Sequence, residues 1–315
     1  NLAASVDEGL VDVADIDAAV RRILEMKYRV GLFEDPYRYA DNARQEATLY
    51  KPEFLEAARD VARKSMVLLK NDGDILPIAA TANRIAVIGP LGNSKADMIG
   101  SWAAGGDRQT RPVTVFEGMQ AHARDGVTVE YAKGASYEFA DEGKTDGFAE
   151  ALALAERSDV IVAAMGEKWD MTGEAASRTS LDLPGNQQAL LEQLVATGKP
   201  VILVLMSGRP NSIEWASENV PAILHAWYPG TQGGHAVADV VFGDYNPSGK
   251  LPVTFPRTVG QVPIHYDMKN TGRPIELGEP GAKYVSRYLS TPNDPLYRFG
   301  YGLSYTEFGY SPVTL

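Results

Sequence analysis

The chain has 315 residues, of which 44% are hydrophobic and 23% charged, and it contains no cysteine. These proportions are typical of a globular protein and exclude a disordered, fibrous or membrane-spanning one, while the missing cysteines exclude disulfides, thiolate metal sites and cysteine nucleophiles. From the same composition we expect no membrane as a partner. Because the net charge is -11, we also expect no nucleic acid as a partner and favour a neutral substrate.

The first part of the chain, residues 1–33, predicts one amphipathic helix. It begins with neither a methionine nor a basic, apolar signal segment, which suggests the interior of a longer polypeptide. Apolar residues recur at helical spacing from Asp15 to about Val30, and Gly31 supplies a stop signal. Nothing nearby in the sequence offers this helix an apolar surface. We therefore expect it to pack on a domain outside this chain.

Residues 34–83 predict a linker followed by a bridging helix. The linker, which begins FEDPYRYADN, shows no clear hydrophobic period. The helix is predicted from Pro52, a residue suited to a first helical position, to about Leu69.

Short apolar runs alternate with amphipathic helices from residue 84 to residue 256. The predicted strands are 84–89, 127–132, 159–166, 200–208 and 222–227, and the predicted helices are 147–157, 186–197, a short one through Trp215, and 232–242. Strands this uniformly apolar are buried on both faces, which requires helices on both sides of a mostly parallel sheet. The sequence thus predicts an α/β domain with a doubly wound, mostly parallel sheet sandwiched by helices.

The end of the chain changes character. Gly, Pro, Tyr and Asn punctuate residues 257–308 without a sustained period, which predicts a long loop excursion with room for one strand pair. Loops of this length are usually functional, and we expect this one to lie close to an active site. Residues 309–315 resemble the start of a strand whose partners are missing.

The predicted architecture indicates where a ligand would bind. In open parallel sheets, ligands bind beyond the carboxyl ends of the strands. The glycine-rich segment GPLGNS after the first strand matches neither a dinucleotide-binding fingerprint nor a phosphate-binding loop. MSGRP, around Ser207, lacks the GxSxG elbow of a serine nucleophile. We therefore expect no nucleotide or other cofactor.

Metal chemistry also lacks support in the sequence. The four histidines form no pair at ligand spacing; they are His122, His225, His235 and His265. What remains is carboxylate chemistry, and one loop after a predicted strand is rich in carboxylates: MGEKWDMTGEAASRTSLDLPG. Its acids are Glu167, Asp170, Glu174 and Asp182.

The residue types alone do not select among these acids, but the surroundings of Glu174 are distinctive. Gly173 precedes it and two small alanines follow it, which allows close approach of a ligand, and Arg178 lies four residues on. Trp102 and Trp169 fall in strand-end loops and could present flat faces to a sugar ring.

Seven segments carry a family resemblance. They are AARDVARKSMVLLKND, IAVIGPLGN, GSWAAGG, GEAASRTSLDLPGNQQALL, KPVILVLMSGRP, ILHAWYPGTQGGHAVADVVFGDYNPSGKLPVTFPR and YRFGYGLSYTEF. In this order they resemble the second half of a glycoside hydrolase family 3 enzyme of the bacterial β-glucosidase type, and they cover most of the chain from Leu55 to Phe308.

The resemblance implies a β/α barrel before this chain, with residues 1–33 holding its last helix, and a fibronectin-III-like domain that starts at residues 309–315. It implies a retaining β-glucosidase whose Asp nucleophile lies on the missing barrel. The family's acid/base Glu stands in a G-E-x-x-x-R context in the α/β domain, which corresponds to Glu174 and Arg178. Glu167 has a G-E pair of its own and ranks second.

We accordingly expect Glu174 to be the acid/base and Trp102, Trp169 and Arg178 to contact a β-glucoside or oligosaccharide. The barrel portion would be a further partner. The resemblance to bacterial members of the family also implies a periplasmic or secreted location. Two alternatives stay open: a non-catalytic sugar-binding or structural domain, and a family 3 enzyme specific for xylose or N-acetylglucosamine.

Overall fold

The computed structural model describes residues 1–103, 105–274, 283–307 and 309–313. The chain divides into two compact units, Asn1–Phe54 and Leu55–Leu315. Each unit is described by itself.

The first unit contains three helices: α1 (Leu2–Asp7), α2 (Val13–Arg29) and α3 (Asn42–Thr48). Helix α2 confirms the predicted amphipathic helix; the Asp12 side chain accepts a hydrogen bond from the backbone N–H of Ala14, and Gly31 follows the helix with a φ of 73°. Three of its apolar side chains are exposed by about half: Val20, Ile23 and Leu24. Helix α3 was not predicted, although Asp41 caps it clearly.

The second unit is built on a six-stranded sheet with the order β1-β6-β5-β4-β2-β3. The strands are β1 (Val67–Asn71), β2 (Arg84–Ile88), β3 (Thr128–Ala132), β4 (Val160–Gly166), β5 (Val201–Met206) and β6 (Ala222–His225). Strand β1 runs antiparallel to β6, and all other neighbours are parallel. The predicted mostly parallel α/β sheet is thus confirmed.

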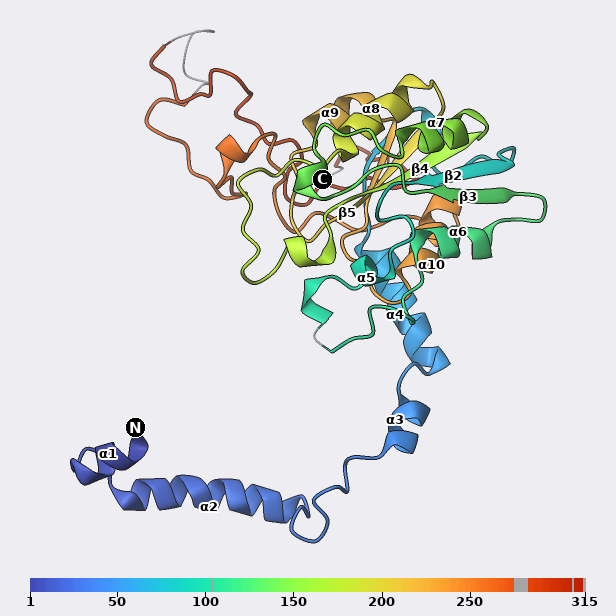
Figure 1. Cartoon of the computed structure of the whole chain (residues 1–315). Helices are drawn as coiled ribbons and strands as arrows, with labels where there is room; N and C mark the ends of the chain where they lie inside the picture. Colours follow the sequence, from blue (N-terminus) through green and yellow to red (C-terminus); the bar gives the residue numbers. More distant parts are fainter. Residues whose placement is uncertain (104, 275–282, 308, 314–315) are drawn as a thin grey trace. The chain divides into compact units, whose positions relative to one another are not determined.

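Helices cover both faces of this sheet, as Figure 1 shows. On one face lie α7 (Phe148–Glu156), α8 (Gln187–Ala196) and α9 (Glu214–Asn219); on the other lie α6 (Val115–His122) and α10 (Gly233–Phe242). Alternate residues of one strand enter opposite cores: Val162 packs with the α6 and α10 side, and Ile161 with the α7 and α8 side. This two-sided burial explains the uniformly apolar strand sequences.

The structure differs from the prediction at three elements of this unit, α4 (Pro52–Ser65), β1 and α6. Helix α4 ends before Leu69, and residues 67–71 instead form β1. Met66 to Leu69 are all buried to 99% or more, which a helix with one apolar stripe could not achieve but a strand covered on both faces can. Helix α6 was also missed, although Thr114 and Glu117 form a capping box at its start.

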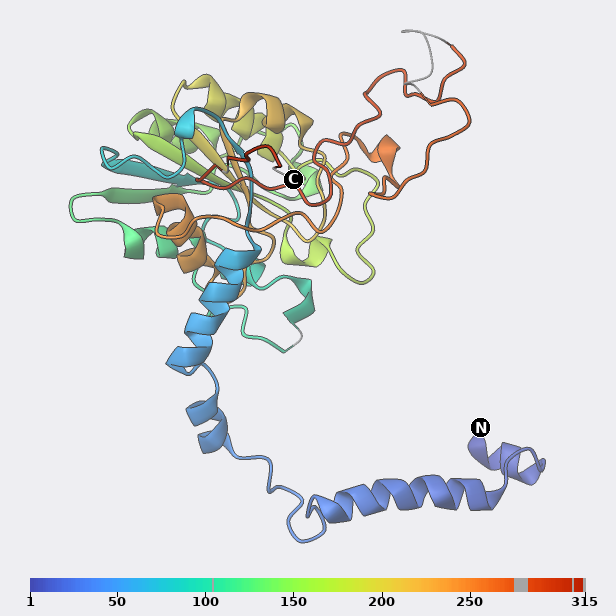
Figure 2. The same ribbon diagram turned by 180° about the vertical axis from the view of Figure 1, so that it is seen from behind.

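Residues 257–307 contain little regular structure where the structure describes them, as predicted. Isolated bridges join Phe255 to Tyr297 and Pro274 to Ser286, and one short 3-10 turn, η5, spans Val259–Gln261. The orange part of this segment extends beyond the layers of the sheet and helices (Figure 2), whereas its dark red end returns to the sheet, where Leu303 bridges Leu68 of β1. Phe308 and residues 314–315 lie outside the described residues, so the predicted strand start there stays untested; residues 309–313 are irregular.

None of the helices in the described ranges is both long enough and apolar enough to cross a membrane.

Candidate active site

The carboxyl ends of β2, β4, β5 and β6 lie at one edge of the sheet because these strands are parallel neighbours. The segments that leave this edge are called the strand-end loops; they comprise residues 89–114, 167–186, 207–213 and 226–232. Residues 167–186, the carboxylate loop, contain all four candidate acids. Its first residue, Glu167, directly follows β4, whose last residue Gly166 pairs with Met206 at the end of β5. The sheet register therefore sets Glu167 beside the loop that begins at Ser207.

Glu167 is completely buried and fully engaged in hydrogen bonds. One carboxylate oxygen accepts from Nη1 of Arg178, and the other accepts from the Ser207 hydroxyl at 2.8 Å and from Nε of Arg209 at 3.1 Å. Two guanidinium groups thus compensate one carboxylate. A general acid has to reach the atom that it protonates, and a carboxylate with this burial and these partners cannot do so without breaking them.

Glu174 has the opposite environment. Its side chain is exposed and makes no hydrogen bond or ion pair with any residue that the structure describes. The backbone on either side is held in the left-handed region, with a φ of 98° at Gly173 and 57° at Ala175. For alanine this conformation costs on the order of 1 kcal/mol, so the surrounding contacts must fix it. The loop therefore presents the Glu174 carboxylate to solvent in a constrained conformation.

Trp102 lies close to the loop that carries Glu174. It belongs to a short 3-10 turn, η2 (Ser101–Ala103), and 76% of its surface is exposed. A Cβ atom placed on Gly173 would lie 2.6 Å from the Ser101 hydroxyl and 3.5 Å from the Trp102 ring. The structure thus brings Trp102 next to the residue that precedes Glu174. An exposed indole at this place could stack on a sugar ring.

Trp169 is partly buried, and it contacts two residues of the loop after β2, Arg108 and Asp97. The Arg108 guanidinium lies 4.1 Å from the centre of its indole ring, in a cation–π geometry. Its backbone N–H donates to Oδ1 of Asp97 at 2.7 Å. Arg108 also donates to the carbonyl of Gly100 at 2.5 Å. These contacts join the loop after β2, which carries Trp102, to the loop after β4, which carries Glu174.

Arg178 does not pair with Glu174, although it lies four residues away. Only 8% of its side chain is exposed, and besides Glu167 it contacts the carbonyl of Asp182 at 2.9 Å and the Phe139 ring at 5.4 Å. The carboxylate loop is not a helix there, so a spacing of four residues does not bring the two side chains together.

The two remaining acids of the loop are exposed and have local partners. Asp170 forms an ion pair with Lys168 at 3.2 Å, and Asp182 accepts a hydrogen bond from the Ser180 hydroxyl at 2.7 Å. Neither contact involves another strand-end loop.

Three residues that shape the site were not identified from the sequence: Asp97, Arg209 and Tyr228. Asp97 is 1% exposed, and burial raises the pKa of its carboxyl, while hydrogen bonds from Ser94 and from the backbone of Trp169 act in the opposite direction. The hydroxyl of Tyr228 donates to the carbonyl of Lys168 at 3.0 Å. The signal in the sequence was the same for all three: each lies in a segment that follows a predicted strand, where parallel sheets bind their ligands.

A cluster of potential metal ligands lies between α4, α6 and α10. Among the described residues, His122, Asp239 and Asp244 could place ligand atoms within 4.8 Å of one another. However, the Arg59 guanidinium donates to both carboxylate oxygens of Asp239 and lies 2.7 Å from Nε2 of His122. A cation is already present between these groups, so they form an ion-pair network between α4, α6 and α10 and do not resemble a metal site.

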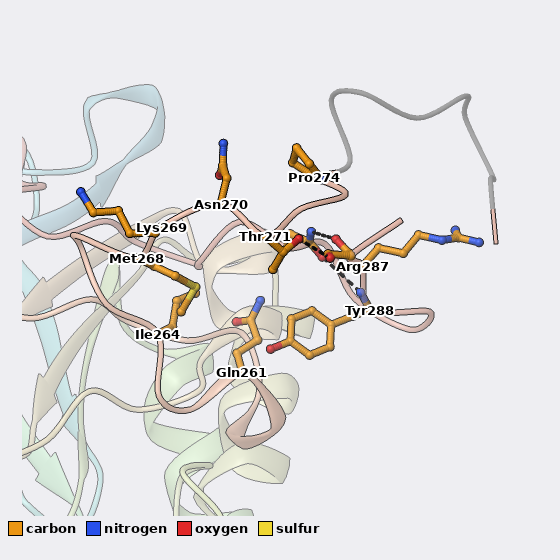
Figure 3. Close-up of a pocket in the computed structure, with 11 residues that line it drawn as sticks. Gln261, Ile264, Met268, Lys269, Asn270, Thr271, Pro274, Arg287 and Tyr288 are labelled. Carbon is orange, nitrogen blue, oxygen red and sulfur yellow. Dashed lines mark hydrogen bonds between the residues drawn. The ribbon is translucent and has the colours of Figure 1, made fainter. Parts of the chain in front are cut away.

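A surface pocket of about 390 Å³ lies in the long loop excursion, where its described lining residues fall between Gln261 and Asn293 (Figure 3). Gln261, Met268 and Tyr288 help to line it, and no carboxyl group is among its described lining residues. Among the residues that the structure describes, this pocket thus has no acid, and none of these lining residues comes from the strand-end loops. That the excursion lies near an active site stays a prediction.

Comparison with known proteins points to one family. The family model described as the glycosyl hydrolase family 3 C-terminal domain matches residues 66–305. The chain is 44% identical to a periplasmic β-glucosidase of Salmonella typhimurium over 98% of its own length, which is 43% of that protein. It is 40% identical to a β-xylosidase of Formosa agariphila, covering 95% of this chain and 40% of that one.

A solved structure agrees with these matches. A mutant β-glucosidase of Listeria innocua in complex with laminaribiose superposes with a TM-score of 0.85 at 38% identity, covering 98% of this chain and 41% of that one. The chain therefore spans about two fifths of the length of the relatives that it matches.

Proposed function

Since this chain belongs to glycosyl hydrolase family 3, we propose that it forms part of a retaining β-glucosidase and supplies the acid/base residue, Glu174. The observation that carries this proposal is the contrast between two glutamates of one loop. Glu174 is exposed, without a partner among the described residues and beside the Trp102 loop, whereas Glu167 is buried and bound to two arginines. An acid/base has to touch substrate, and of these two only Glu174 is accessible.

The proposed reaction has two steps. Glu174 gives its proton to the glycosidic oxygen while a carboxylate nucleophile outside this chain attacks the anomeric carbon, so that the glycosidic bond breaks and a glycosyl-enzyme forms. Glu174, now ionised, then takes a proton from the water that hydrolyses this intermediate. The two carboxyl groups must lie roughly 5 Å apart for this chemistry. The active site would therefore form between this α/β domain and the barrel portion.

The tryptophans would form the wall of this site. Trp102, with an exposed ring next to Gly173, is positioned to stack on the leaving-group sugar. Trp169 carries an arginine on its ring, and Arg178 is bound to Glu167, so we propose that both act on substrate mainly through the shape of the loop.

The proposed substrates are β-glucosides or β-linked oligosaccharides. Support comes from the names of the relatives: one is a periplasmic β-glucosidase, and another was solved with laminaribiose. The same argument proposes a periplasmic location. A β-xylosidase is the second candidate, because a relative of that name is 40% identical. The ratio of kcat/KM for 4-nitrophenyl β-glucoside and β-xyloside decides between them.

The test of the proposal uses Glu174→Ala in the intact enzyme, which includes the barrel portion. For glucosides with poor leaving groups, kcat/KM should fall by about 100-fold or more, because acid catalysis supplies roughly 10²–10⁴-fold. For 2,4-dinitrophenyl glucoside, whose leaving group needs no proton, kcat/KM should change little, and azide should restore turnover.

The matched control is Asp170→Ala, which removes an exposed acid of the same loop. It should leave kcat/KM unchanged for glucosides with either kind of leaving group. Equal losses for both leaving groups without azide rescue would contradict the assignment of Glu174. An inactive wild-type enzyme whose barrel lacks a nucleophile would instead favour a sugar-binding role.

A further inference from the structure

Arg209 binds the backbone on both sides of the segment that carries Glu174. Nη2 of Arg209 donates to the carbonyl of Met171 and, at 2.8 Å, to the carbonyl of Ala176. These two carbonyls stand at either end of residues 172–175, and Glu174 lies within that short segment. A single guanidinium nitrogen thus ties together the two ends of the backbone turn that presents Glu174.

The guanidinium of Arg209 is also bound by the buried carboxylate of Glu167. Its Nε donates to Oε2 of Glu167 at 3.1 Å, and the Ser207 hydroxyl donates to the same oxygen at 2.8 Å. Glu167 is completely buried, and the side chain of Arg209 is 19% exposed. Because both ends of the interaction are largely removed from water, it is stronger than an exposed ion pair and fixes the planar guanidinium in one orientation.

The Glu167 carboxylate also fixes the later part of the carboxylate loop, residues 178–182. Arg178 donates to Oε1 of Glu167 and, at 2.9 Å, to the carbonyl of Asp182. Glu167 therefore orients two arginines, and together they hold three backbone carbonyls of the carboxylate loop. The left-handed conformations at Gly173 and Ala175 lie inside the region that these bonds enclose.

We propose that Arg209 is a positioning residue for Glu174 and that Glu167 is the internal counter-charge that fixes Arg209. The proposal rests on the proposed function of Glu174 as acid/base. Arg209 does not touch substrate in this scheme. It holds the turn of residues 172–175 so that the Glu174 carboxyl meets the glycosidic oxygen, and a displacement of about 1 Å at such a group can cost on the order of 100-fold in rate.

The test uses Arg209→Lys in the intact enzyme. Lysine retains the charge that compensates Glu167, but a single ammonium cannot bridge Met171, Ala176 and Glu167 with the planar geometry of arginine. For glucosides with poor leaving groups, kcat/KM should fall by about 10- to 100-fold; for 2,4-dinitrophenyl glucoside it should stay within about threefold. The alkaline limb of the pH profile, which reports the protonated acid, should persist, whereas Glu174→Ala should abolish it.

The matched control is Arg157→Lys. Arg157 also binds one carboxylate, Glu130 at 2.9 Å, and one backbone carbonyl, Ala153 at 3.1 Å, but it precedes β4 and so lies at the opposite end of that strand from Glu167. This variant should leave the rates for both leaving groups unchanged.

A second variant, Ser207→Ala, removes the hydroxyl that donates to Glu167 and accepts from the backbone N–H of Arg209 at 3.1 Å. Ser207→Ala should lower kcat/KM less than Arg209→Lys does, and again mainly for glucosides with poor leaving groups. If Arg209→Lys folds poorly, Ser207→Ala still tests the proposal.

The outcomes separate the two proposals. Suppose that Glu174→Ala shows the leaving-group dependence, whereas Arg209→Lys and Ser207→Ala both lower kcat/KM equally for all substrates or leave it unchanged. The positioning role is then wrong, and the acid/base assignment of Glu174 stands. If Glu167→Gln, and not Glu174→Ala, shows azide rescue, the proposed function of Glu174 is wrong and this inference fails with it.

Discussion

A Cβ atom at Gly173 would lie 2.6 Å from the hydroxyl oxygen of Ser101, so the loop after β4 and the loop after β2 touch where only glycine fits. Real Cβ atoms do not approach another atom this closely. Gly173 also has a φ of 98°, which disfavours any side chain. The contact sets the spacing between Trp102 and the turn that carries Glu174.

Gly173→Ala should therefore damage activity more than stability. We expect kcat/KM for a β-linked disaccharide to fall by about 10-fold or more, because Glu174 moves relative to the sugar. Gly105→Ala is the control, since a Cβ there would have no described atom within 4 Å and its φ is not positive. Equal activity of the two variants would show that the spacing of the two loops does not matter.

Trp102→Ala should raise KM for disaccharides by several-fold, roughly the loss of 1 kcal/mol or more of stacking, and should leave thermal stability unchanged because 76% of the residue is exposed. Trp102→Tyr should restore most of the affinity, since it retains a flat ring. Initial-rate kinetics with laminaribiose, the disaccharide bound in the related structure, is the measurement. An unchanged KM in Trp102→Ala would remove this residue from the binding site.

Asp239→Asn should destabilise the α/β domain by about 2 to 3 kcal/mol. Asp239 is 3% exposed in its side chain and binds Arg59, which is 25% exposed, so the loss should fall below that of a fully buried pair. Burial raises the pKa of Asp239, but the hydrogen bonds and charge of Arg59 outweigh this effect and lower the pKa overall. The stabilisation is therefore present above the ordinary carboxyl pKa and is lost as the pH falls below it.

Native-state hydrogen exchange of the β5 amides in the intact enzyme measures this loss. Asp294→Asn, which breaks an exposed ion pair with Arg298, is the control and should have no measurable effect. Similar protection in both variants would contradict a stabilising role for the buried network.

His225 should make the domain sensitive to acid. It is fully buried, and neither ring nitrogen forms a hydrogen bond of good geometry with a described residue. Burial lowers its pKa to about 3, against a smaller opposing effect from the backbone of Leu205. The unfolded chain binds a proton near pH 6.5 that the folded chain does not. Stability should therefore fall by about 1.4 kcal/mol for each pH unit between roughly 6.5 and 3.

His225→Leu should flatten this part of the pH dependence, and unfolding of the two proteins between pH 7 and pH 4 provides the comparison. His265→Asn, at an exposed position, should leave the slope unchanged. A slope that is the same in wild type and His225→Leu would show that other groups cause the acid sensitivity.

Much of the fold could be read from the sequence because strands β2, β4, β5 and β6 are buried on both faces. Such strands need continuous apolar runs, as in the segment that forms β5, and these runs stand out between amphipathic helices. Strand β1 was missed because its apolar residues also continue the stripe of α4. Only pairing with β6 decides between helix and strand there.

The candidate site was predicted only in part. The sequence by itself determined the loop that holds the carboxylates, its place after a buried strand, and the two glutamates with a preceding glycine. Which of these glutamates is buried was decided by the tertiary structure, because Arg209 and Ser207 reach Glu167 from another strand, some 40 residues away along the chain. Burial and charge compensation depend on neighbours that are distant in sequence, so no local pattern around Glu167 or Glu174 could reveal them.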